Sequence, residues 1–261
     1  MLWKNNIAIT NLTMSILNKL FNIKPKTADS NFVNPITTEI HSHLIPNIDD
    51  GVQSIQESIA VFKHFAERGY KKVITTPHIM GDFYKNGPEN ILPALDIIST
   101  ELKNQGINIE IQAAAEYMID DAFEKKIASG NLLTFGQNHV LVELPFTEEP
   151  ANFKSALFEL RIAGYKPVLA HPERYAFLAM HRDKFTELFE QGILFQINLF
   201  SLIGYYSPQV KKTAEFLIEN KMVHMVGSDC HGPRHLPVFN DAIKSYNYQR
   251  ICELPLINNN L

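Results

Sequence analysis

The sequence has few cysteines and no excess of charge of one sign. Cys230 and Cys252 are its only two cysteines and form no CxxC pair, so neither a disulfide framework nor a thiolate zinc site is expected. The net charge of -4 lacks the basic excess typical of nucleic-acid-binding proteins. The scarcity of cysteine and of excess positive charge favours a globular protein of a reducing cytoplasm and disfavours a nucleic-acid partner.

Long apolar runs are also missing. No run is long enough to cross a bilayer, and the start of the chain lacks the roughly 7 to 15 uninterrupted apolar residues of a secretory signal. We interpret residues 1–35 as a leader outside the core, flexible or amphipathic, in which the basic segment from Met14 suits contact with a membrane surface or a partner. Residues 36–261 contain no internal repeat or linker and are predicted to form one domain.

Short apolar runs alternate with segments of helical periodicity from residue 36 onward, which predicts an α/β fold with a parallel sheet. The predicted strands are ITTEIH, KKVITTPH, INIEIQAAAE, HVLVELP, KPVLAHP, ILFQINLF and MVHMVGSDCH. The first helix is expected to begin after Ser54, with Glu57 completing a capping box, and to end at Gly69. Further helices are predicted at about 88–105, 120–129, 150–163, 182–191, 207–220 and 236–246.

Nearly every predicted strand ends in a residue type that binds metals, and an α/β barrel gathers its strand ends on one face. These residues are His41, His43, His78, Glu116, Glu143, His171, Asp229 and His231, and Asp50 follows the first strand in the loop NIDDG. His41 and His43 are two positions apart on an extended strand, so their side chains point to the same face.

A metal centre is the hypothesis that this set favours. Five histidines and four carboxylates in equivalent positions are hard to explain by packing, because ionised carboxylates beside a core are costly unless they are paired or metal-bound. His64, His139, His181 and His224 do not follow the pattern and are interpreted as structural or solvated, whereas His235 lies close enough to His231 for either role.

Six motifs resemble the polymerase-and-histidinol-phosphatase (PHP) family, and within it the bacterial tyrosine phosphatases that regulate capsule synthesis. They are EIHSHLIPNIDDGVQSIQESI, TTPH, AAEY, VELP, AHPERY and GSDCH, and the resemblance covers about residues 36–246. The resemblance implies a distorted (β/α)7 barrel similar to a TIM barrel, with three divalent ions. Mn²⁺ is the ion that the resemblance favours, with iron, zinc, magnesium and cobalt as alternatives.

The resemblance also implies how the ligands are divided. His41, His43, Glu116 and Asp229 would hold one ion; Glu116 would bridge to a second ion held by Glu143 and His171; Asp50, His78 and His231 would hold the third. Mixed carboxylate and imidazole ligands suit hard divalent cations.

The chain departs from the family in two places. Family members commonly begin with D-x-H-x-H, whereas Glu39 stands at the Asp position, so any support for the metal histidines is altered. The tyrosine phosphatases usually carry an arginine five residues after the last metal histidine, where this chain has Leu236, and Arg234 is the nearest substitute. Arg174 in HPERY is expected to bind the phosphate bidentately.

The predicted reaction is hydrolysis of a phosphomonoester by in-line attack of a metal-activated hydroxide. A thiol mechanism at Cys230 is disfavoured, because it needs an arginine six positions on, where Leu236 stands. The expected substrate is a phosphotyrosine protein, namely a bacterial tyrosine kinase that controls capsule or exopolysaccharide synthesis, through which a cytoplasmic enzyme could associate with the membrane. The alternatives are a phosphatase for a small metabolite such as histidinol phosphate, a nucleotide-directed phosphoesterase, and a non-catalytic partner of polysaccharide assembly; an oligomer is compatible with each.

Overall fold

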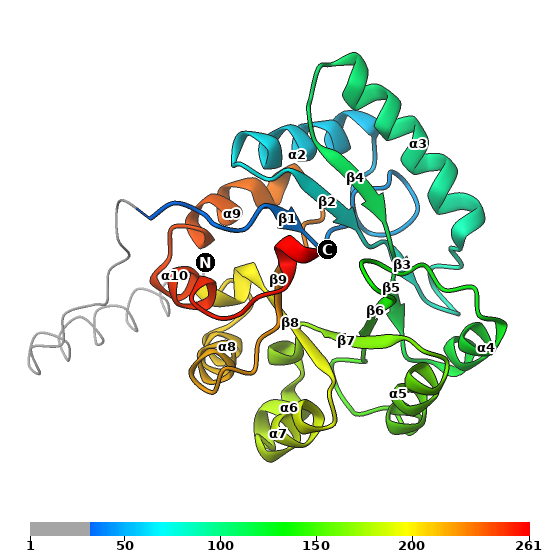
Figure 1. Ribbon diagram of the computed structural model, residues 1–261, viewed down its shortest axis with the longest axis vertical. Coiled ribbons are helices and arrows are strands. Elements are labelled where there is room, and N and C mark those ends of the chain that lie inside the picture. Colours follow the sequence, from blue (N-terminus) through cyan, green and yellow to red (C-terminus); the bar gives the residue numbers. More distant parts are fainter. Residues whose placement is uncertain (1–31) are drawn as a thin grey trace, which may run out of the picture.

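The computed structural model describes residues 32–261, in which parallel strands form a ring surrounded by helices (Figure 1). The strands are β1 (Thr38–Glu39), β2 (Lys72–Thr75), β3 (His78–Ile79), β4 (Glu110–Ala113), β5 (Glu116–Met118), β6 (His139–Glu143), β7 (Lys166–Ala170), β8 (Leu194–Asn198) and β9 (Met225–Gly227). The α-helices are α2 (Ile55–Glu67), α3 (Pro88–Asn104), α4 (Asp121–Ser129), α5 (Phe153–Ile162), α6 (Ala176–Met180), α7 (Asp183–Glu190), α8 (Pro208–Glu219), α9 (Leu236–Ala242) and α10 (Tyr246–Cys252). The predicted leader lies almost wholly outside the described residues.

Two sets of parallel strands make up the ring. One set has the order β1-β2-β4 and the other β3-β5-β6-β7-β8-β9. The segment after β1 pairs with the segment after β9, because the Asp229 amide donates to the His41 carbonyl at 2.7 Å and the His43 amide donates to the Cys230 carbonyl at 2.9 Å. The distorted α/β barrel predicted from the sequence is confirmed.

Two of the predicted strands are interrupted. KKVITTPH contains β2 and then β3, and INIEIQAAAE contains β4 and then β5. Pro77 has no amide hydrogen to donate at the first break. There the Thr75 hydroxyl accepts a hydrogen bond from the Leu44 amide and donates one to the Ser42 carbonyl, in place of a regular strand ladder.

Successive side chains along a strand point to opposite faces, so the barrel has one hydrophobic core inside the ring and another between the ring and the helices. In β6, Val140 and Val142 pack toward the surrounding helices, whereas Leu141 points into the ring. A layer of apolar side chains from four of the strands and the segments beside them fills the ring: Ile40, Ile74, Ala114, Phe135, Leu141, Val168, Ala170 and Met225. The barrel is therefore packed inside, and polar chemistry is confined to its C-terminal rim.

The helix signals in the sequence are largely confirmed. The Ser54 hydroxyl accepts a hydrogen bond from the Glu57 amide at 3.2 Å, and Gly69 follows α2 with φ 88°. The capping-box prediction was wrong in one detail, because the Glu57 carboxylate accepts from the Gln53 amide and not from that of Ser54. The helix predicted at 236–246 was too long: α9 ends at Ala242, and α10 is a separate helix.

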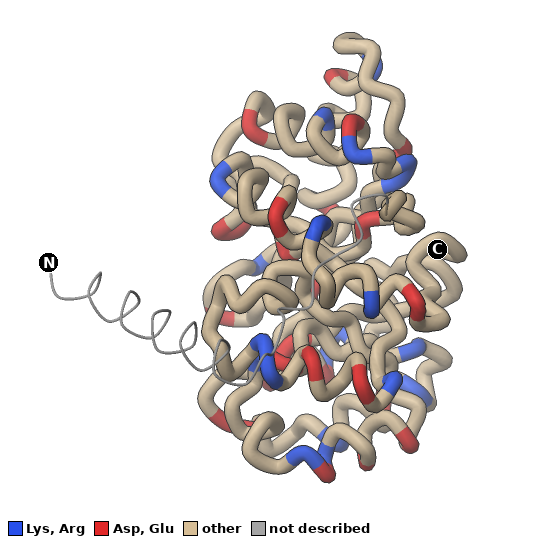
Figure 2. The backbone as a smooth tube through the Cα atoms, turned by 90° about the vertical axis from the view of Figure 1, so that its left-hand side faces the viewer, with Lys and Arg blue, Asp and Glu red and all other residues tan. Residues whose placement is uncertain are grey.

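Charged residues of both signs are interspersed over the molecule, without a continuous basic stripe on the side drawn in Figure 2. Among the helices described, none combines the length and apolar character needed to span a bilayer.

Candidate metal centre

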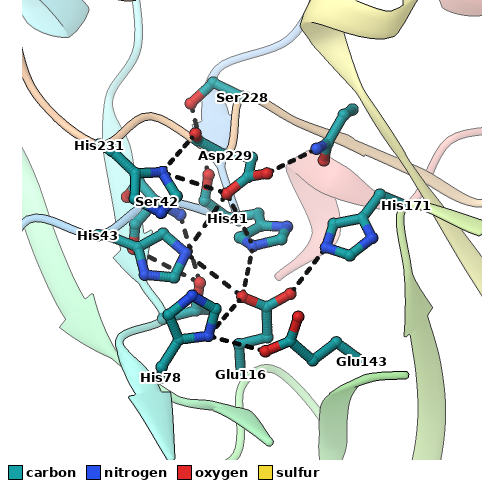
Figure 3. Close-up of polar contacts among 12 residues, drawn as sticks. His41, Ser42, His43, His78, Glu116, Glu143, His171, Ser228, Asp229 and His231 are labelled. Atoms are coloured by element: carbon teal, nitrogen blue, oxygen red, sulfur yellow. Dashed lines mark hydrogen bonds and ion pairs between the residues drawn. The ribbon is translucent and has the colours of Figure 1, made fainter. Parts of the chain in front are cut away.

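All nine metal-ligand candidates come together at one rim of the barrel, although His78 and Glu116 are the first residues of β3 and β5 and not strand ends as predicted. The candidate ligands labelled in Figure 3 converge from several segments of the chain, with the Glu116 carboxylate among the imidazoles. The candidates form four overlapping groups, and within each group the ligand atoms all lie within 4.8 Å of one another. Together the four groups include all nine residues. Folding therefore gathers residues that are nearly 200 positions apart in the chain, as parallel strands do.

Glu116 lies at the centre of the cluster. Its Oε2 is 3.1 Å from His41 Nε2 and 3.3 Å from His43 Nε2, and its Oε1 is 3.0 Å from His171 Nε2. The Asp229 Oδ1 lies 3.5 Å from His41 Nε2 and 3.4 Å from His43 Nε2. Both carboxylates thus face the same two imidazoles, as expected for ligands of one ion.

The remaining candidates lie on either side of Glu116. Asp50 Oδ1 is 3.5 Å from His78 Nε2 and 3.4 Å from His231 Nε2. Glu143 Oε1 is 2.8 Å from the other ring nitrogen of His78. The geometry places Glu143 with His78 and Glu116, and His171 with His41 and Asp229, whereas the resemblance implies Glu143 and His171 on one ion. The division of ligands among ions stays a prediction.

Unpartnered buried atoms indicate that the cluster fits cations. Six buried side-chain atoms of the cluster make no hydrogen bond, although five of them face one another at 2.8–3.3 Å: His41 Nε2, His43 Nε2, His78 Nδ1, His171 Nδ1, Glu116 Oε2 and Glu143 Oε1. A buried polar atom left without a partner costs about 1–3 kcal/mol. A divalent ion at these lone pairs would remove that cost and would neutralise the crowded carboxylates.

Two side chains outside the predicted set orient the first histidine pair. Gln196 Oε1 accepts from His41 Nδ1 at 2.7 Å, and Asp49 Oδ2 accepts from His43 Nδ1 at 2.8 Å. Both contacts fix the hydrogen on Nδ1 and leave Nε2 free to bind an ion. Neither residue was predicted, although the glutamine inside the apolar strand ILFQINLF and the first aspartate of NIDDG were available as signals.

The Glu39 carboxylate accepts hydrogen bonds from backbone amides and, in the part of the chain that the structure describes, does not bond to the ring of a metal histidine. Its Oε1 accepts hydrogen bonds from the amides of Ile40, His41 and Ser228 at 2.9–3.1 Å. Burial raises the pKa of this carboxyl to about 7. Glu39 therefore connects β1 to the segment after β9, while Gln196 supports the His41 ring.

Two of the candidate ligands have unusual backbone conformations. His171 has φ 36° and Asp229 has φ 54°, a left-handed region that non-glycine residues rarely adopt. His171 directly follows β7, and Asp229 lies two residues after the end of β9. Such strain gathers at functional sites.

Burial and mutual repulsion set the protonation of the cluster. Burial and the neighbouring Glu116 carboxylate raise the pKa of Glu143 to about 7. Burial and the Arg174 guanidinium lower the pKa of His171 to about 4, so that its imidazole is neutral and able to bind a metal.

A cavity of about 350 Å³ opens over the cluster, and Arg174 and Arg234 both line it. Arg174 Nη1 donates to Asp229 Oδ2 at 2.8 Å, and its guanidinium carbon lies 4.6 Å from the centroid of the Phe146 ring and 4.2 Å from that of the Tyr206 ring. Arg234 is more exposed and lies in the turn that follows His231. The cavity thus brings two cationic side chains beside the cluster.

His235 also lines the cavity, but its ring is already engaged: the His231 amide donates to His235 Nδ1 at 3.1 Å. Burial and the nearby His231 and Arg234 lower its pKa to about 4. His235 therefore holds the turn as a neutral ring.

Cys230 is buried and does not line the cavity. Burial raises the pKa of its thiol to about 12, and Sγ donates to the Gly232 carbonyl at 3.5 Å. This environment gives no thiolate nucleophile.

Known proteins are similar to this chain in sequence and in fold. The family model described as "Capsular polysaccharide synthesis, CpsB/CapC" matches residues 37–250. The chain is 31% identical to the tyrosine-protein phosphatase YwqE of Bacillus subtilis, over 74% of this chain and 76% of that protein. It is 27% identical to the tyrosine-protein phosphatase CpsB of Streptococcus pneumoniae, over 83% of this chain and 93% of that protein.

A solved structure resembles this one over most of its length. It belongs to a crystallographic study of YwqE and CpsB, described as unique metal-dependent tyrosine phosphatases. The TM-score is 0.74 at 28% identity, covering 83% of this chain and 90% of that one.

Proposed function

Because the chain belongs to the CpsB/CapC family, we propose that it is a metal-dependent phosphatase that hydrolyses phosphotyrosine in proteins. The observation that carries this proposal is the convergence of five histidines and four carboxylates beneath a cavity that also contains Arg174. The relatives' names supply the substrate class, and the cluster supplies the chemistry.

The donor set suits Mn²⁺, and we assign the nine ligands to three ions as the resemblance implies. When bound, such ions lower the pKa of water and neutralise phosphoryl oxygens. The described residues contain no thiolate ligand in this set, which disfavours metals that require sulfur.

The chain's own residues supply binding and orientation. The Arg174 N–H groups that do not contact Asp229 are free to donate to phosphoryl oxygens, in a cavity whose buried floor strengthens charge-assisted bonds. Asn198 Nδ2 donates to Asp229 Oδ2 at 2.7 Å, so this carboxylate is held from two sides. Arg234 would reach the same phosphate from the opposite turn.

The physiological substrate that we propose is a bacterial tyrosine kinase that controls capsule or exopolysaccharide synthesis, dephosphorylated in the cytoplasm. We further propose that residues 36–261 form one phosphoesterase domain and residues 1–35 a leader. The family description supports the link to polysaccharide synthesis.

A substrate panel tests the proposal. Phosphotyrosine peptide, histidinol phosphate and a single-stranded oligonucleotide would each be assayed with Mn²⁺, using His41→Ala as the inactive control. We expect the phosphotyrosine peptide to give the highest kcat/KM. Preference for histidinol phosphate would indicate the small-molecule alternative, and activity of His41→Ala equal to wild type would refute the metal mechanism.

A further inference from the structure

Two exposed aromatic side chains lie at the cavity over the metal cluster. Phe146, in the segment between β6 and α5, is 43% exposed, and Tyr205, between β8 and α8, is 49% exposed. Both line the cavity whose floor contains the candidate ligands. Large aromatic rings exposed beside a polar pocket commonly mark a ligand-binding surface.

Phe146 is fixed against the phosphate-binding groups. Its ring stacks on His171 with centroids 5.7 Å apart and an interplanar angle of 29°, and the Arg174 guanidinium lies 4.6 Å from its centroid. The ring therefore adjoins both a candidate metal ligand and the phosphate clamp, while nearly half of it remains open.

Tyr205 is held by edge contacts. Its centroid is 5.3 Å from that of Tyr206 and 5.9 Å from that of His235, and both ring pairs are close to perpendicular. These contacts leave part of the ring exposed within the cavity, on the side of the turn that contains Arg234.

We propose that Phe146 and Tyr205 contact the ring of the leaving group and thereby select aryl phosphates over alkyl phosphates. This inference rests on the proposed function. The ring of an aryl phosphate is joined to phosphorus through a single oxygen, so a phosphoryl group on the cavity floor places that ring beside the aromatic side chains. An alkyl phosphate of similar charge has no π face to offer to them.

Kinetics on paired substrates tests the assignment. Phenyl phosphate and glycerol 2-phosphate would be compared in wild type, Phe146→Ala, Phe146→Leu and Tyr205→Ala, with Mn²⁺ occupancy measured in each. Because an aromatic pair contributes a modest stabilisation, we expect each alanine variant to lose about three- to tenfold in kcat/KM for phenyl phosphate and little for glycerol 2-phosphate. Phe146→Leu, which keeps an apolar side chain, should lie between wild type and Phe146→Ala.

Two controls separate selectivity from structural damage. Phe158→Ala removes a phenylalanine that is 65% exposed on α5 and does not line the cavity, so it should change neither substrate. Calorimetric binding of phenylphosphonate and methylphosphonate to the Mn²⁺-loaded protein should show the same loss for the aryl compound alone, without any turnover.

The outcomes distinguish the two proposals. Equal losses for both substrates, or unchanged aryl kinetics, would overturn the role of Phe146 and Tyr205 while leaving the phosphatase activity in place. A wild type that hydrolyses no aryl phosphate would overturn the proposed function, and equal binding of the two phosphonates by wild type would then overturn the aryl site as well.

Discussion

At the scale of single residues, the position of a side chain decides what it can do. Cys230 lies between the candidate ligands Asp229 and His231 in sequence, yet its side chain is buried away from the cavity they line. The alternation of side chains at a strand end sends neighbours to opposite sides. A catalytic role therefore cannot be inferred from adjacency alone.

Cys230→Ser should keep most of the activity on phosphotyrosine substrate. The thiol is buried and its pKa is raised to about 12, so it is not a nucleophile at neutral pH. Steady-state kinetics would measure this, and labelling with iodoacetamide should modify Cys230 only after unfolding. A loss of a hundredfold or more in a folded, metal-loaded Cys230→Ser protein would return the thiol mechanism to consideration.

Arg174 and Arg234 should differ in their contribution to kcat/KM. A preorganised bidentate donor to the phosphoryl group is worth about 2–4 kcal/mol, so Arg174→Ala should lose about a hundredfold or more. Arg234 is more exposed, and we expect Arg234→Ala to lose about tenfold or less.

Arg174 also donates to Asp229, so metal content must be measured in each variant before the kinetics are compared. The double variant then shows whether the two guanidinium groups act on the same phosphate, since coupled residues give non-additive losses. Wild-type kinetics in fully loaded Arg174→Ala would contradict the clamp.

At the scale of the elements, the sequence predicted which residues converge better than it predicted strand boundaries, because His78 and Glu116 begin β3 and β5 where strand ends were expected. His78, Glu116 and Glu143 could be predicted because each follows or ends an apolar run, and a barrel brings such ends together. The breaks that separate β2 from β3 and β4 from β5 were not predicted, and at the first of them the Thr75 side chain bonds to the distant segment that contains Ser42 and Leu44. Local periodicity contains no information on such contacts.

The same limit explains the residues that were missed. Asp49 and Gln196 look like ordinary loop and strand residues in sequence, and only the folded chain shows that they contact His43 and His41. The aromatic residues of the cavity lie on segments between elements, whose conformations follow no period.

Gly227 in β9 should not tolerate alanine. An added Cβ would lie 2.5 Å from the Cβ of His41 and 3.1 Å from Gln196 Nε2, at the point where the ring closes. Gly227→Ala should therefore displace His41 and lower metal content together with kcat, and it should reduce the free energy of unfolding by about 1–3 kcal/mol.

Gly106→Ala is a matched control for this prediction. It imposes a positive φ of 67° on alanine, but nothing lies within 4 Å of the added Cβ. It should cost stability while metal content and kcat per folded molecule stay at the wild-type level. Full metal content and wild-type kcat in Gly227→Ala would show that ring closure is more tolerant than the geometry implies.

At the scale of the whole molecule, the acidic balance and the mixed surface charge fit a protein substrate better than a nucleic acid. The confirmed barrel confines its polar cluster to one end, above an apolar interior layer. The buried carboxylates repel one another at this rim, to which many of the strands contribute. Bound cations should remove that repulsion and thereby stabilise the whole fold.

Metal removal should lower Tm, and the difference should grow with pH. A ligand present at about 100 times its Kd stabilises by about 2.7 kcal/mol, which for a chain of this size corresponds to roughly 5–10 °C. Differential scanning calorimetry in EDTA and in Mn²⁺ at pH 6, 7.5 and 9 measures this, together with activity, which chelation should abolish.

The sign of the pH dependence follows from His41. Burial lowers its pKa, but the Glu116 and Asp229 carboxylates outweigh burial and raise it to about 9 in the metal-free cluster. This raised pKa stabilises the metal-free fold fully below the unfolded value of about 6.5, and the contribution is lost as pH rises through 9. A metal ion must displace the proton from His41. Metal binding therefore becomes tighter as pH rises through about 9, while the metal-free protein becomes less stable.

His41→Ala should abolish the Mn²⁺-dependent rise in Tm at every pH, whereas alanine at the exposed His181 should leave it unchanged. If the wild-type protein melts at one temperature in EDTA and in Mn²⁺ from pH 6 to 9, with metal content shown to differ, then the buried cluster is not where the ions bind. If Mn²⁺ raises Tm by the same amount at every pH, then the ions bind carboxylates alone and His41 is not one of their ligands.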